Sequence, residues 1–433
     1  MAKKKVIILG AGLTGLSAAW HLQKRSIPYI IFEKERSIGG LCRSKKIDGF
    51  TFDCDGHMLH FRHRYVFNLV KSLLGDNLVK HERNAWIHFY DRLIRYPFQA
   101  NLFGLPSRIA RECLTGYLKV HKNKLYEYAN FEDWIKFTFG YGIAKHFMIP
   151  YNSKFWTLPL KELTCDWLAG FIPIPTREQV VLGAKRDVPK QFGYNASFWY
   201  PRSGGINELP KVLACGLKDV RIGCRAKRID LKKKEISLSS GGKETFDCLI
   251  STIPLPEVWH IAPDLPASVA VSFKKLKWNS IFNFNIGLNH CGNHNRHWIY
   301  FPDNKLCFFR VGFINNISSS LVPRGKSSMY IEVAYSRERP LDKRKIITNI
   351  IRDLKSVNLI SCPDEVCLQD INDIEYGYPI YDLFYKHSRD NAVGFLRENG
   401  VISCGRYGSW RYMSMEDAIQ DGRRAADEVG KLF

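Results

Sequence analysis

Residues 3–34 read KKKVIILGAGLTGLSAAWHLQKRSIPYIIFEK, and this stretch decides the fold class. A short apolar run ends in Gly10, Gly12 and Gly15, helical apolar spacing follows, and a second apolar run ends in Glu33. Strand, glycine turn, helix, strand and acid are in the order of a βαβ unit that binds a dinucleotide. The glycines would permit, in turn, a tight bend, close approach of a pyrophosphate and close helix packing, and Glu33 would accept hydrogen bonds from ribose hydroxyls.

Further glycine motifs, outward from this stretch, favour a flavin nucleotide. Gly39-Gly40-Leu41 follows Glu33 at the place where flavoproteins let the backbone approach the flavin's phosphates. Gly56 precedes His57 after a predicted strand at 50–53, so His57 is either an ordinary loop histidine or a neighbour of the isoalloxazine ring. We therefore expect FAD as the cofactor.

Composition limits the function classes. The chain has 433 residues, 45% of them hydrophobic, which is enough for two or three domains, and it has no long apolar run that could cross a membrane. Its 12 cysteines form no CxxC pair, so we expect free thiols and a cytoplasmic location. The net charge of +22 favours an anionic partner. No nucleic-acid motif accompanies it, so an anionic small ligand, and after that a peripheral membrane surface, rank above nucleic acid. The oligomeric state stays open.

Pattern changes along the chain divide it into domains. Helical spacing over 107–139 lies outside any dinucleotide fold, and alternating patterns from 278 to 335 predict an antiparallel sheet. The predicted fold class is α/β, a Rossmann-like FAD-binding domain with an inserted helical domain and an antiparallel β-sheet domain. The predicted boundaries are 1–85, 201–265 and 390–433 for the FAD-binding domain, 102–170 for the helical domain, and 86–101, 171–200 and 266–389 for the sheet domain.

One cluster has the residue types of a metal site. His290, Cys291, His294 and His297 lie within eight positions of one another. Polar residues between them and alternating strands on either side favour a hairpin loop, and we predict no metal.

A set of ordered motifs then resembles one family, the UDP-galactopyranose mutases, and in particular their eukaryotic type. The resemblance spans nearly the whole chain. Beyond the glycine motifs, it rests on Tyr96-Pro97-Phe98-Gln99, Phe147-Met148-x-Pro150-Tyr151-Asn152-x-Lys154-x-Trp156, Gly193-x-Asn195-Ala196-x-Phe198, Trp298-x-Tyr300-Phe301-Pro302, Phe309-Arg310, Gly377-Tyr378-Pro379 and Gly405-Arg406-x-Gly408-Ser409-Trp410-Arg411-Tyr412.

The resemblance implies roles for individual residues. Arg310, Tyr378 and Tyr412 would hold the diphosphate of a nucleotide sugar, and Arg406 would bind FAD near its pyrophosphate. His57 and the backbone around Met415 would lie beside the flavin. The remaining substrate-binding residues would be a base wall (Phe147, Asn152, Trp156), a flap (Tyr96, Phe98, Gln99) and two residues near the sugar (Asn195, Tyr300).

The chain departs from the eukaryotic pattern in two places. Eukaryotic members carry a second diphosphate arginine where an ungapped alignment puts Phe171, whereas Ile174-Pro175-Thr176-Arg177 fits a bacterial pattern. We therefore expect Arg177 to be the second phosphate arginine. The tail Met413-Ser414-Met415-Glu416-Asp417 is also nearer to the bacterial form, which leaves the sugar and the base open.

In the resembled family the reduced flavin N5 attacks the anomeric carbon, and the sugar changes between pyranose and furanose on the flavin. This chemistry implies a nucleotide-sugar substrate, most simply a UDP-sugar, and NAD(P)H or another reductant. The alternatives are an FAD-dependent oxidase or dehydrogenase of the amine oxidase or protoporphyrinogen oxidase class, and a non-enzymatic protein that binds nucleotide sugars.

Overall fold

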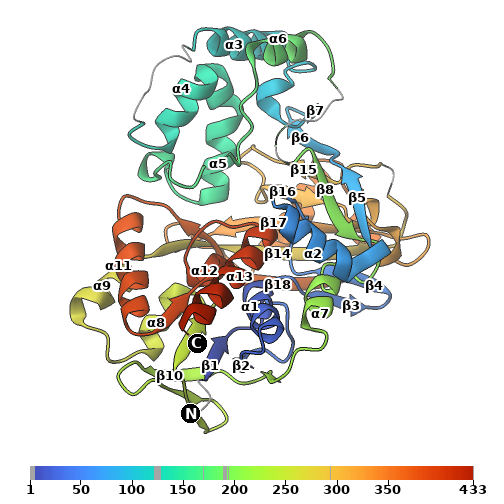
Figure 1. The fold of residues 1–433 in the computed structure, drawn as a ribbon. Helices are drawn as coiled ribbons and strands as arrows, with labels where there is room; N and C mark the ends of the chain where they lie inside the picture. The colour runs from blue at the N-terminus through green and yellow to red at the C-terminus, as the bar shows by residue number, and fades with distance from the viewer. Residues whose placement is uncertain are drawn as a thin grey trace.

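The computed structural model describes residues 5–120, 128–168, 170–188, 193, 195–292 and 294–432. Figure 1 shows a helical part at the top of the molecule, above a body in which helices and sheets are layered. The body contains the N-terminal strand, and the last helix returns to lie against the first one.

The FAD-binding part is built on a parallel sheet with strand order β19-β13-β1-β2-β9. Its strands are Val6–Leu9 (β1), Tyr29–Phe32 (β2), Val220–Arg221 (β9), Cys248–Ser251 (β13) and Val401–Ser403 (β19). Because both faces are covered by helices, β1 is apolar throughout and buried. The helices of this part are Leu13–Lys24 (α1), Arg64–Leu74 (α2), Glu208–Ala214 (α7), Leu255–Ile261 (α8), Tyr385–Glu398 (α11), Gly405–Gly408 (α12) and Met415–Leu432 (α13).

Helices α1 and α13 pack unusually closely. A Cβ added at Gly422 of α13 would lie 2.2 Å from the Thr14 carbonyl oxygen of α1. Gly422, Ala425 and Ala426 leave room for this contact, since small side chains let two helices approach. The C-terminal helix is thereby fixed beside the glycine turn.

A seven-stranded sheet, ordered β18-β14-β17-β16-β15-β6-β7, forms the platform under the helical part. Its strands are Ala85–Phe89 (β6), Arg92–Arg95 (β7), Lys277–Leu288 (β14), Trp298–Tyr300 (β15), Arg310–Gly312 (β16), Ser327–Tyr335 (β17) and Val366–Ile380 (β18). Neighbouring strands are antiparallel except for β15 and β6, which are parallel. The antiparallel platform expected for 278–335 is confirmed, and one parallel pair joins the hairpin β6–β7 to it.

The two faces of this sheet differ. One packs an apolar core against the helix Ile346–Ser356 (α10). The other carries Ile281, Phe309, Ala334 and Ile374, against which Tyr151, Phe155 and Tyr378 pack. The second face is therefore the one that meets the flavin side of the molecule. Other described elements are Ser44–Ile47 (β3) paired with Phe50–Asp53 (β4), Leu78–Glu82 (β5) paired with Ser197–Pro201 (β8), the meander Ala226–Asp230 (β10), Glu235–Leu238 (β11) and Lys243–Thr245 (β12), and the helix Ala267–Lys275 (α9).

The helical part consists of Ser107–Leu118 (α3), Phe131–Ile143 (α4), Ile149–Trp156 (α5) and Arg177–Lys185 (α6). Glycines set the contact of α3 with α4, because a Cβ at Gly142 would lie 2.6 Å from the Cys113 backbone. The helical spacing of the sequence is interrupted at 121–124, which predicts a helix break there, and these residues lie outside the described part of the chain. Helix α6, which the predicted boundaries assign to the sheet domain, packs against α3 at the top of Figure 1.

All 12 cysteines are free thiols. Burial raises the pKa of several of them, because it disfavours the thiolate; these are Cys42, Cys54, Cys113, Cys248, Cys307 and Cys404. Among the described residues, no helix is both long enough and apolar enough to cross a bilayer.

Candidate active site

The first glycine turn forms a cradle of bare backbone. Gly10 has a φ of +98°, which favours glycine, and it accepts the close approach of Thr252. A Cβ on Gly15 would lie 1.9 Å from the Gly10 carbonyl oxygen, so no side chain fits there. Strand β1 and helix α1 can therefore meet at the sharp angle that aims the amide groups of α1 into the cradle.

The second glycine pair closes the opposite side of this cradle. Gly12 forms a parallel bridge with Gly39, and a Cβ added to Gly12 would meet only the Gly40 Cα, at 3.8 Å. Gly40 has a φ of +60°. A gap walled by backbone on both sides suits a pyrophosphate, which binds to peptide N–H groups.

Glu33 lies at the edge of the cradle and is only 6% exposed. One carboxylate oxygen accepts from the Ala11 N–H at 2.7 Å and the other from the Glu35 N–H at 2.9 Å. Each oxygen keeps a further lone pair, which is free to accept a second hydrogen bond such as one from a ribose hydroxyl.

The C-terminal segment supplies the rest of the cradle. Gly405 has a φ of +76° and lies against Thr14 of α1, where a Cβ would be 2.5 Å from the threonine hydroxyl. Arg406 follows, and its buried Nε has no hydrogen-bond partner among the described residues. A buried guanidinium N–H without an acceptor is costly, and an oxygen of a phosphate would satisfy it. The glycine gap, Glu33 and Arg406 together fit FAD.

A pocket of about 300 Å³ lies beside this cradle, between the helical part, the seven-stranded sheet and the FAD-binding part. It brings together most of the residues predicted from sequence. These are Leu41, Gly56, His57, Tyr96, Gln99, Phe147, Asn152, Asn195, Tyr300, Arg310, Tyr378, Arg406, Tyr412 and Met415.

Arg310 lines this pocket and is also paired with a buried acid. Its guanidinium makes two hydrogen bonds to Glu332, one of them Nη2 to Oε1 at 2.6 Å, and Glu332 is fully buried. The side chain of Asp55 reaches the same carboxylate and lines the pocket. Burial, and next the charge of Glu332, raise the pKa of Asp55 well above its usual range. One arginine and two carboxyl groups, one of them favoured as the neutral acid, thus form a single cluster.

The backbone of Asp55 has a positive φ, which is uncommon for residues other than glycine. Its φ is +77°, and its own carboxylate accepts from the Gly56 N–H at 2.8 Å. The next position must be glycine, because a Cβ on Gly56 would lie 2.7 Å from the Tyr330 ring. His57 follows, with a pKa lowered to about 4 mainly by burial, so its imidazole is neutral at pH 7.

Aromatic rings form the wall of the pocket on the helical side. The Phe147 ring stacks on Tyr151 with centroids 5.5 Å apart, and Tyr151 meets Tyr300 edge to face at 5.4 Å. On the other side Tyr378 and Tyr412 are stacked at 5.6 Å, with the Arg406 guanidinium over both rings. Asn152 donates from Nδ2 to the Met148 carbonyl oxygen at 2.7 Å, which fixes its amide in the wall.

The segment predicted to be a flap is firmly seated in this structure. Gln99 is buried and donates to the Pro173 carbonyl oxygen at 2.7 Å, while Tyr96 stacks near Tyr300 at 5.0 Å. Arg83, which no sequence motif marks, lies over the Tyr96 ring at 4.6 Å and hydrogen-bonds Asn195. These contacts connect the Tyr96 segment to Asn195 and Tyr300, which both line the pocket.

Three of the residues predicted to contact the substrate do not line the pocket. Phe98 and Trp156 are fully buried behind it, where Phe98 stacks on Phe147 and Trp156 packs on Tyr378. Arg177 is at the start of α6, and its guanidinium donates to the carbonyl oxygens of Leu118 and Val120 at the end of α3. In this conformation Arg177 joins two helices, and the position predicted from the eukaryotic pattern is filled by Phe171, which packs on Tyr412.

Sequence reasoning missed several residues that line the pocket, above all Asp55, Tyr151 and Phe155. It also missed Glu332, the buried partner of Arg310. For Glu332 a signal existed, since it is the one charged residue in the apolar strand SSMYIEVAY. A charge in a buried strand needs a partner, and Arg310 supplies it. No comparable signal marked Asp55, because an acid before glycine in a loop is common.

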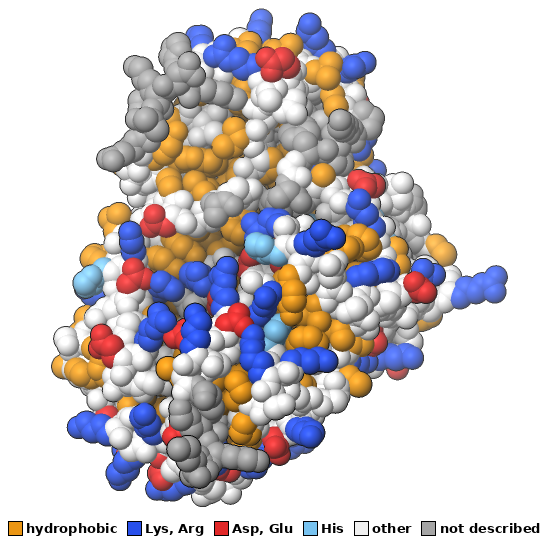
Figure 2. Space-filling model, in the orientation of Figure 1, with side chains coloured by type: hydrophobic (Ala, Val, Ile, Leu, Met, Phe, Trp, Pro, Cys, Tyr) orange, Lys and Arg blue, Asp and Glu red, His pale blue; other side chains and the backbone are white. Residues whose placement is uncertain are grey.

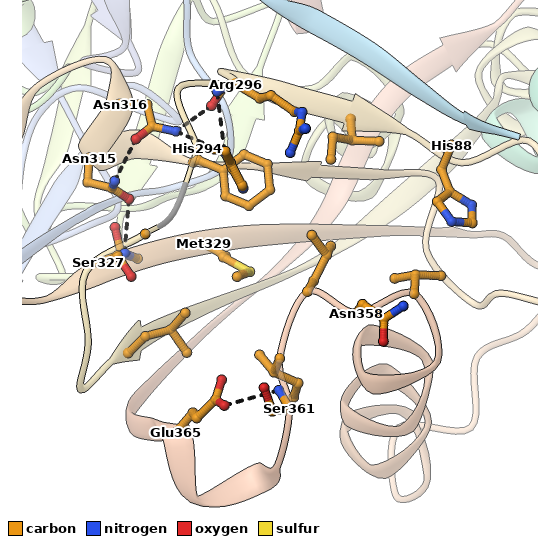
Figure 3. A pocket seen from close by; sticks show the side chains of 18 of the residues that line it. His88, His294, Arg296, Asn315, Asn316, Ser327, Met329, Asn358, Ser361 and Glu365 are labelled. Atoms are coloured by element: carbon orange, nitrogen blue, oxygen red, sulfur yellow. Dashed lines mark hydrogen bonds between the residues drawn. The ribbon is translucent and has the colours of Figure 1, made fainter. Parts of the chain in front are cut away.

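A second, larger cavity of about 580 Å³ lies on the α10 side of the sheet. Figure 3 shows its polar rim, in which Asn316 donates to the Arg296 carbonyl oxygen and Asn315 to Asn316, above an apolar floor that includes Met329. His290 and His294, considered above for zinc, belong to this rim, and no described metal-like group contains them.

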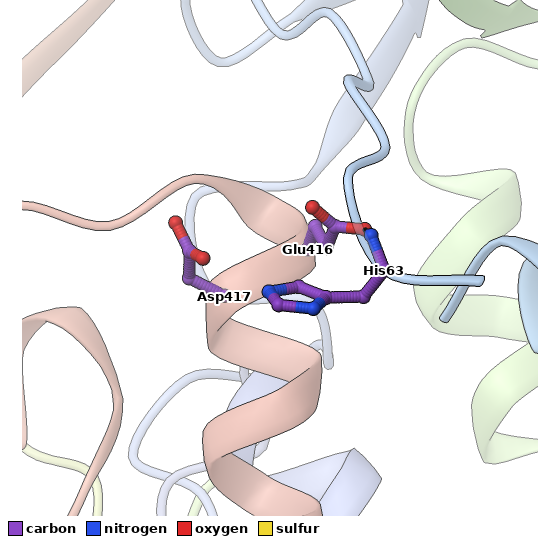
Figure 4. Close-up of side chains that lie close together, drawn as sticks. All are labelled: His63, Glu416 and Asp417. Atoms are coloured by element: carbon purple, nitrogen blue, oxygen red, sulfur yellow. Dashed lines mark hydrogen bonds between the residues drawn. The ribbon is translucent and has the colours of Figure 1, made fainter. Parts of the chain in front are cut away.

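The described residues contain one group of metal-ligand type, His63, Glu416 and Asp417 (Figure 4). Both Glu416 oxygens already accept from backbone N–H groups of Arg62 and His63, and Asp417 accepts from the Arg62 guanidinium. These hydrogen bonds hold the segment of Arg62 and His63 against the start of α13, and we propose no metal there.

Comparisons with known proteins agree with this geometry. A family model described as flavin containing amine oxidoreductase matches residues 13–430. A crystal structure of reduced UDP-galactopyranose mutase superposes with a TM-score of 0.93 and 28% identity, over 99% of this chain and 96% of that one. Wild-type putrescine oxidase bound to putrescine superposes with a TM-score of 0.68 and 14% identity over 99% of both chains, which shows the fold alone.

Among curated proteins, coproporphyrinogen III oxidase of Bacillus subtilis is 20% identical over the whole chain and 99% of its own length. The FAD-containing monooxygenase EthA of Mycobacterium tuberculosis is 46% identical over 94 residues, so this chain matches 19% of that protein's length. The family match spans nearly the whole chain and the glycine cradle fits the nucleotide, so the chain belongs to the flavin containing amine oxidoreductases and its cofactor is FAD.

Proposed function

We propose that the protein interconverts the pyranose and furanose forms of a nucleotide-diphosphate sugar, with UDP-galactose as the first candidate. The main support is the convergence of Arg310, Arg406, Tyr378 and Tyr412 on one pocket beside the FAD cradle. The full-length likeness to UDP-galactopyranose mutase supports the same substrate class.

Arg310 would hold the diphosphate of the substrate, whereas Arg406 would serve the neighbouring FAD. A guanidinium binds phosphate oxygens with parallel N–H groups, and the tyrosine hydroxyls add neutral donors. Such a clamp keeps the leaving nucleoside diphosphate in place for its return to the sugar. In the described conformation Arg310 uses its fork on Glu332, so binding would redirect part of that fork.

The aromatic wall would hold the base. Phe147 and Tyr151 are stacked rings at the pocket surface, and a pyrimidine stacked on such rings gains about 1–3 kcal/mol. The amide of Asn152 keeps its carbonyl oxygen for a base N–H because its NH₂ is engaged with Met148.

When bound and reduced, FAD supplies the nucleophilic nitrogen that the reaction needs, so NAD(P)H or another reductant is required. The protein's own residues position and shield the sugar. Tyr96, Gln99 and Tyr300 cover the pocket from the sheet side and would exclude water that could hydrolyse the sugar.

An oxidase is the second candidate function, because the family model and the putrescine oxidase fold both point to that class. Oxygen separates the two. An oxidase consumes O₂ with its substrate in the absence of reductant, whereas a mutase works only when its flavin is kept reduced.

The experiment is to incubate the purified flavoprotein, reduced with dithionite, with a panel of UDP- and dTDP-sugars and to separate the products by anion-exchange chromatography. We expect furanose and pyranose forms of one UDP-sugar to interconvert under reducing conditions only. The Arg310→Lys variant serves as a matched control that keeps the charge but loses the bidentate fork. Oxygen consumption without isomerisation would overturn the proposal.

A further inference from the structure

The turn between β18 and α11 displays two large apolar side chains to solvent. Leu383 is 72% exposed and Phe384 58% exposed, and they are adjacent in sequence. Val271 on the neighbouring helix α9 is 49% exposed. Figure 1 shows α9 and α11 next to each other at the left edge of the molecule, in agreement with their extensive contact.

This exposure does not come from a loose loop. The Asp382 carboxylate accepts from the Phe384 N–H at 3.0 Å, and Asp382 itself bridges to Leu163. The Tyr381 carbonyl oxygen accepts from Thr164, and the Tyr381 ring lies 4.0 Å from Tyr385. Leu383 and Phe384 are therefore held outward on a turn that is fixed on both sides.

Lysines surround the apolar pair. Lys275 Nζ lies 5.0 Å from the Phe384 ring centroid, and Lys274 Nζ lies 4.4 Å from the Trp259 ring. Lys386 follows on α11 and is exposed. Within the described part of the chain, Lys274, Lys275 and Lys386 appear in no ion pair with an acid.

Three acids near the patch are already engaged. Asp382 is buried and lies 3.5 Å from Lys277, Asp390 pairs with Arg389, and Glu257 accepts from the Tyr376 hydroxyl. The exposed patch of Val271, Leu383 and Phe384 with Lys274, Lys275 and Lys386, here called the apolar–lysine patch, is therefore positively charged. Lys and Arg also outnumber acids over the face shown in Figure 2, consistent with the net charge of +22.

We propose that the apolar–lysine patch docks the protein on a membrane surface that contains anionic lipid. Leu383 and Phe384 would enter the headgroup region, and Lys274, Lys275 and Lys386 would contact lipid phosphates. Contiguous apolar surface rimmed by charge marks an interaction site, and several unpaired lysines favour an anionic surface over a second copy of this basic chain. The apolar insertion and the electrostatic attraction each contribute modestly, so docking is reversible and weakens as the salt concentration rises.

The proposal is independent of the reaction that the flavin site performs. The test is co-sedimentation of the FAD-loaded full chain with vesicles of phosphatidylcholine alone or of phosphatidylcholine mixed with phosphatidylglycerol, whose anionic headgroups give the vesicle a negative surface potential. We expect binding to the acidic vesicles only, reduced by raising the salt concentration.

Two variants locate the surface. Leu383→Ser combined with Phe384→Ser should weaken vesicle binding at least about tenfold, because removing two apolar insertions costs more than one factor of ten. Lys274→Glu combined with Lys275→Glu should abolish the preference for acidic lipid. Tyr90→Ser is the matched control, since Tyr90 is 65% exposed on the β6–β7 turn beside Asp91.

Flavin content and the melting temperature of each variant, equal to those of the unaltered protein, would establish that the fold is intact. Vesicle binding that survives both double variants would overturn the assignment. So would light scattering that shows a dimer which Leu383→Ser and Phe384→Ser convert to a monomer, because the patch would then be a self-interface.

Discussion

The FAD cradle consists of backbone, most of it from one stretch of sequence, whereas the substrate pocket consists of side chains drawn from residues 41 to 415. Gly10 and Gly15 lie within one βαβ unit, and each is needed there because it lacks a side chain. Arg310, Tyr378 and Tyr412 line the pocket only because distant segments bring them together. A site made of backbone is therefore disrupted by substitutions that add atoms. A site made of side chains is disrupted by substitutions that remove atoms or charge.

The largest effect is expected at the pocket. Arg310→Ala should lower kcat/KM for the nucleotide sugar about 10²–10³-fold, because a buried diphosphate loses a bidentate partner and Glu332 is left unpaired. Flavin content should remain unchanged, as measured by absorbance of the purified protein. Normal isomerisation by this variant would remove Arg310 from the site.

FAD binding should be sensitive to a single methyl group added in the cradle. Gly15→Ala places a Cβ 1.9 Å from the Gly10 carbonyl oxygen, so bound FAD should fall at least about tenfold. Gly394→Ala is the matched control, because its Cβ would meet no atom within 4 Å in helix α11. Equal flavin content in both variants would contradict the close packing described for the turn.

Asp55 should make the free energy of unfolding depend on pH. Its pKa is raised in the folded protein, so between the unfolded and the folded pKa the native state binds a proton that the unfolded state does not. The free energy of unfolding should therefore fall as pH rises through this window, by up to about 1.4 kcal/mol per pH unit. Asp55→Asn should remove that decline and melt at a higher temperature than the unaltered protein at pH 8.

Melting curves at pH 5 and pH 8 check this prediction. Asparagine also accepts the positive φ, which separates the charge effect from backbone strain. A decline with pH that is identical in both proteins would place the titration elsewhere. His57 cannot cause such a decline, because its pKa is lowered from 6.5 to about 4 in the folded protein, so its contribution to stability rises with pH between these two values.

The smallest effect is expected at Arg177. Its guanidinium donates to Leu118 and Val120 at the exposed end of α3, so Arg177→Ala should change kcat/KM less than about threefold and cost at most about 1 kcal/mol of stability. A loss above a hundredfold would restore the role predicted from sequence and require the segment before α6 to move toward the substrate.

Sequence reasoning succeeded where a local rule decides the structure. The glycine spacing of residues 10–15 requires the βα turn, and strict alternation in β14 and β17 requires a sheet, and both are present. It failed where the outcome depends on which distant segments meet. The pattern Ile-Pro-x-Arg selected Arg177 by spacing alone, but the capping box of Thr176 and Gln179 starts a helix there and turns the arginine toward α3.

The same limit explains the acid cluster. Glu332 could be recognised as a buried charge, but its partner depends on the pairing of β16 with β17. Asp55 could not be recognised, because its contact with Glu332 depends on a backbone φ of +77°. Asparagine, aspartate and glycine all adopt a positive φ in loops, so the residue type alone does not mark this position. Domain boundaries stay a prediction.

The contact of α13 with α1 has a consequence for biosynthesis. Gly405 and Arg406 complete the nucleotide site, and Gly422 packs on Thr14 across nearly the full length of the chain. A growing polypeptide that has emerged from the ribosome only as far as residue 390 has the glycine turn but lacks the segment that closes it. FAD can therefore be captured firmly only after translation of the last helix, and nicks or truncations before residue 405 should yield colourless protein whatever the state of the first 400 residues.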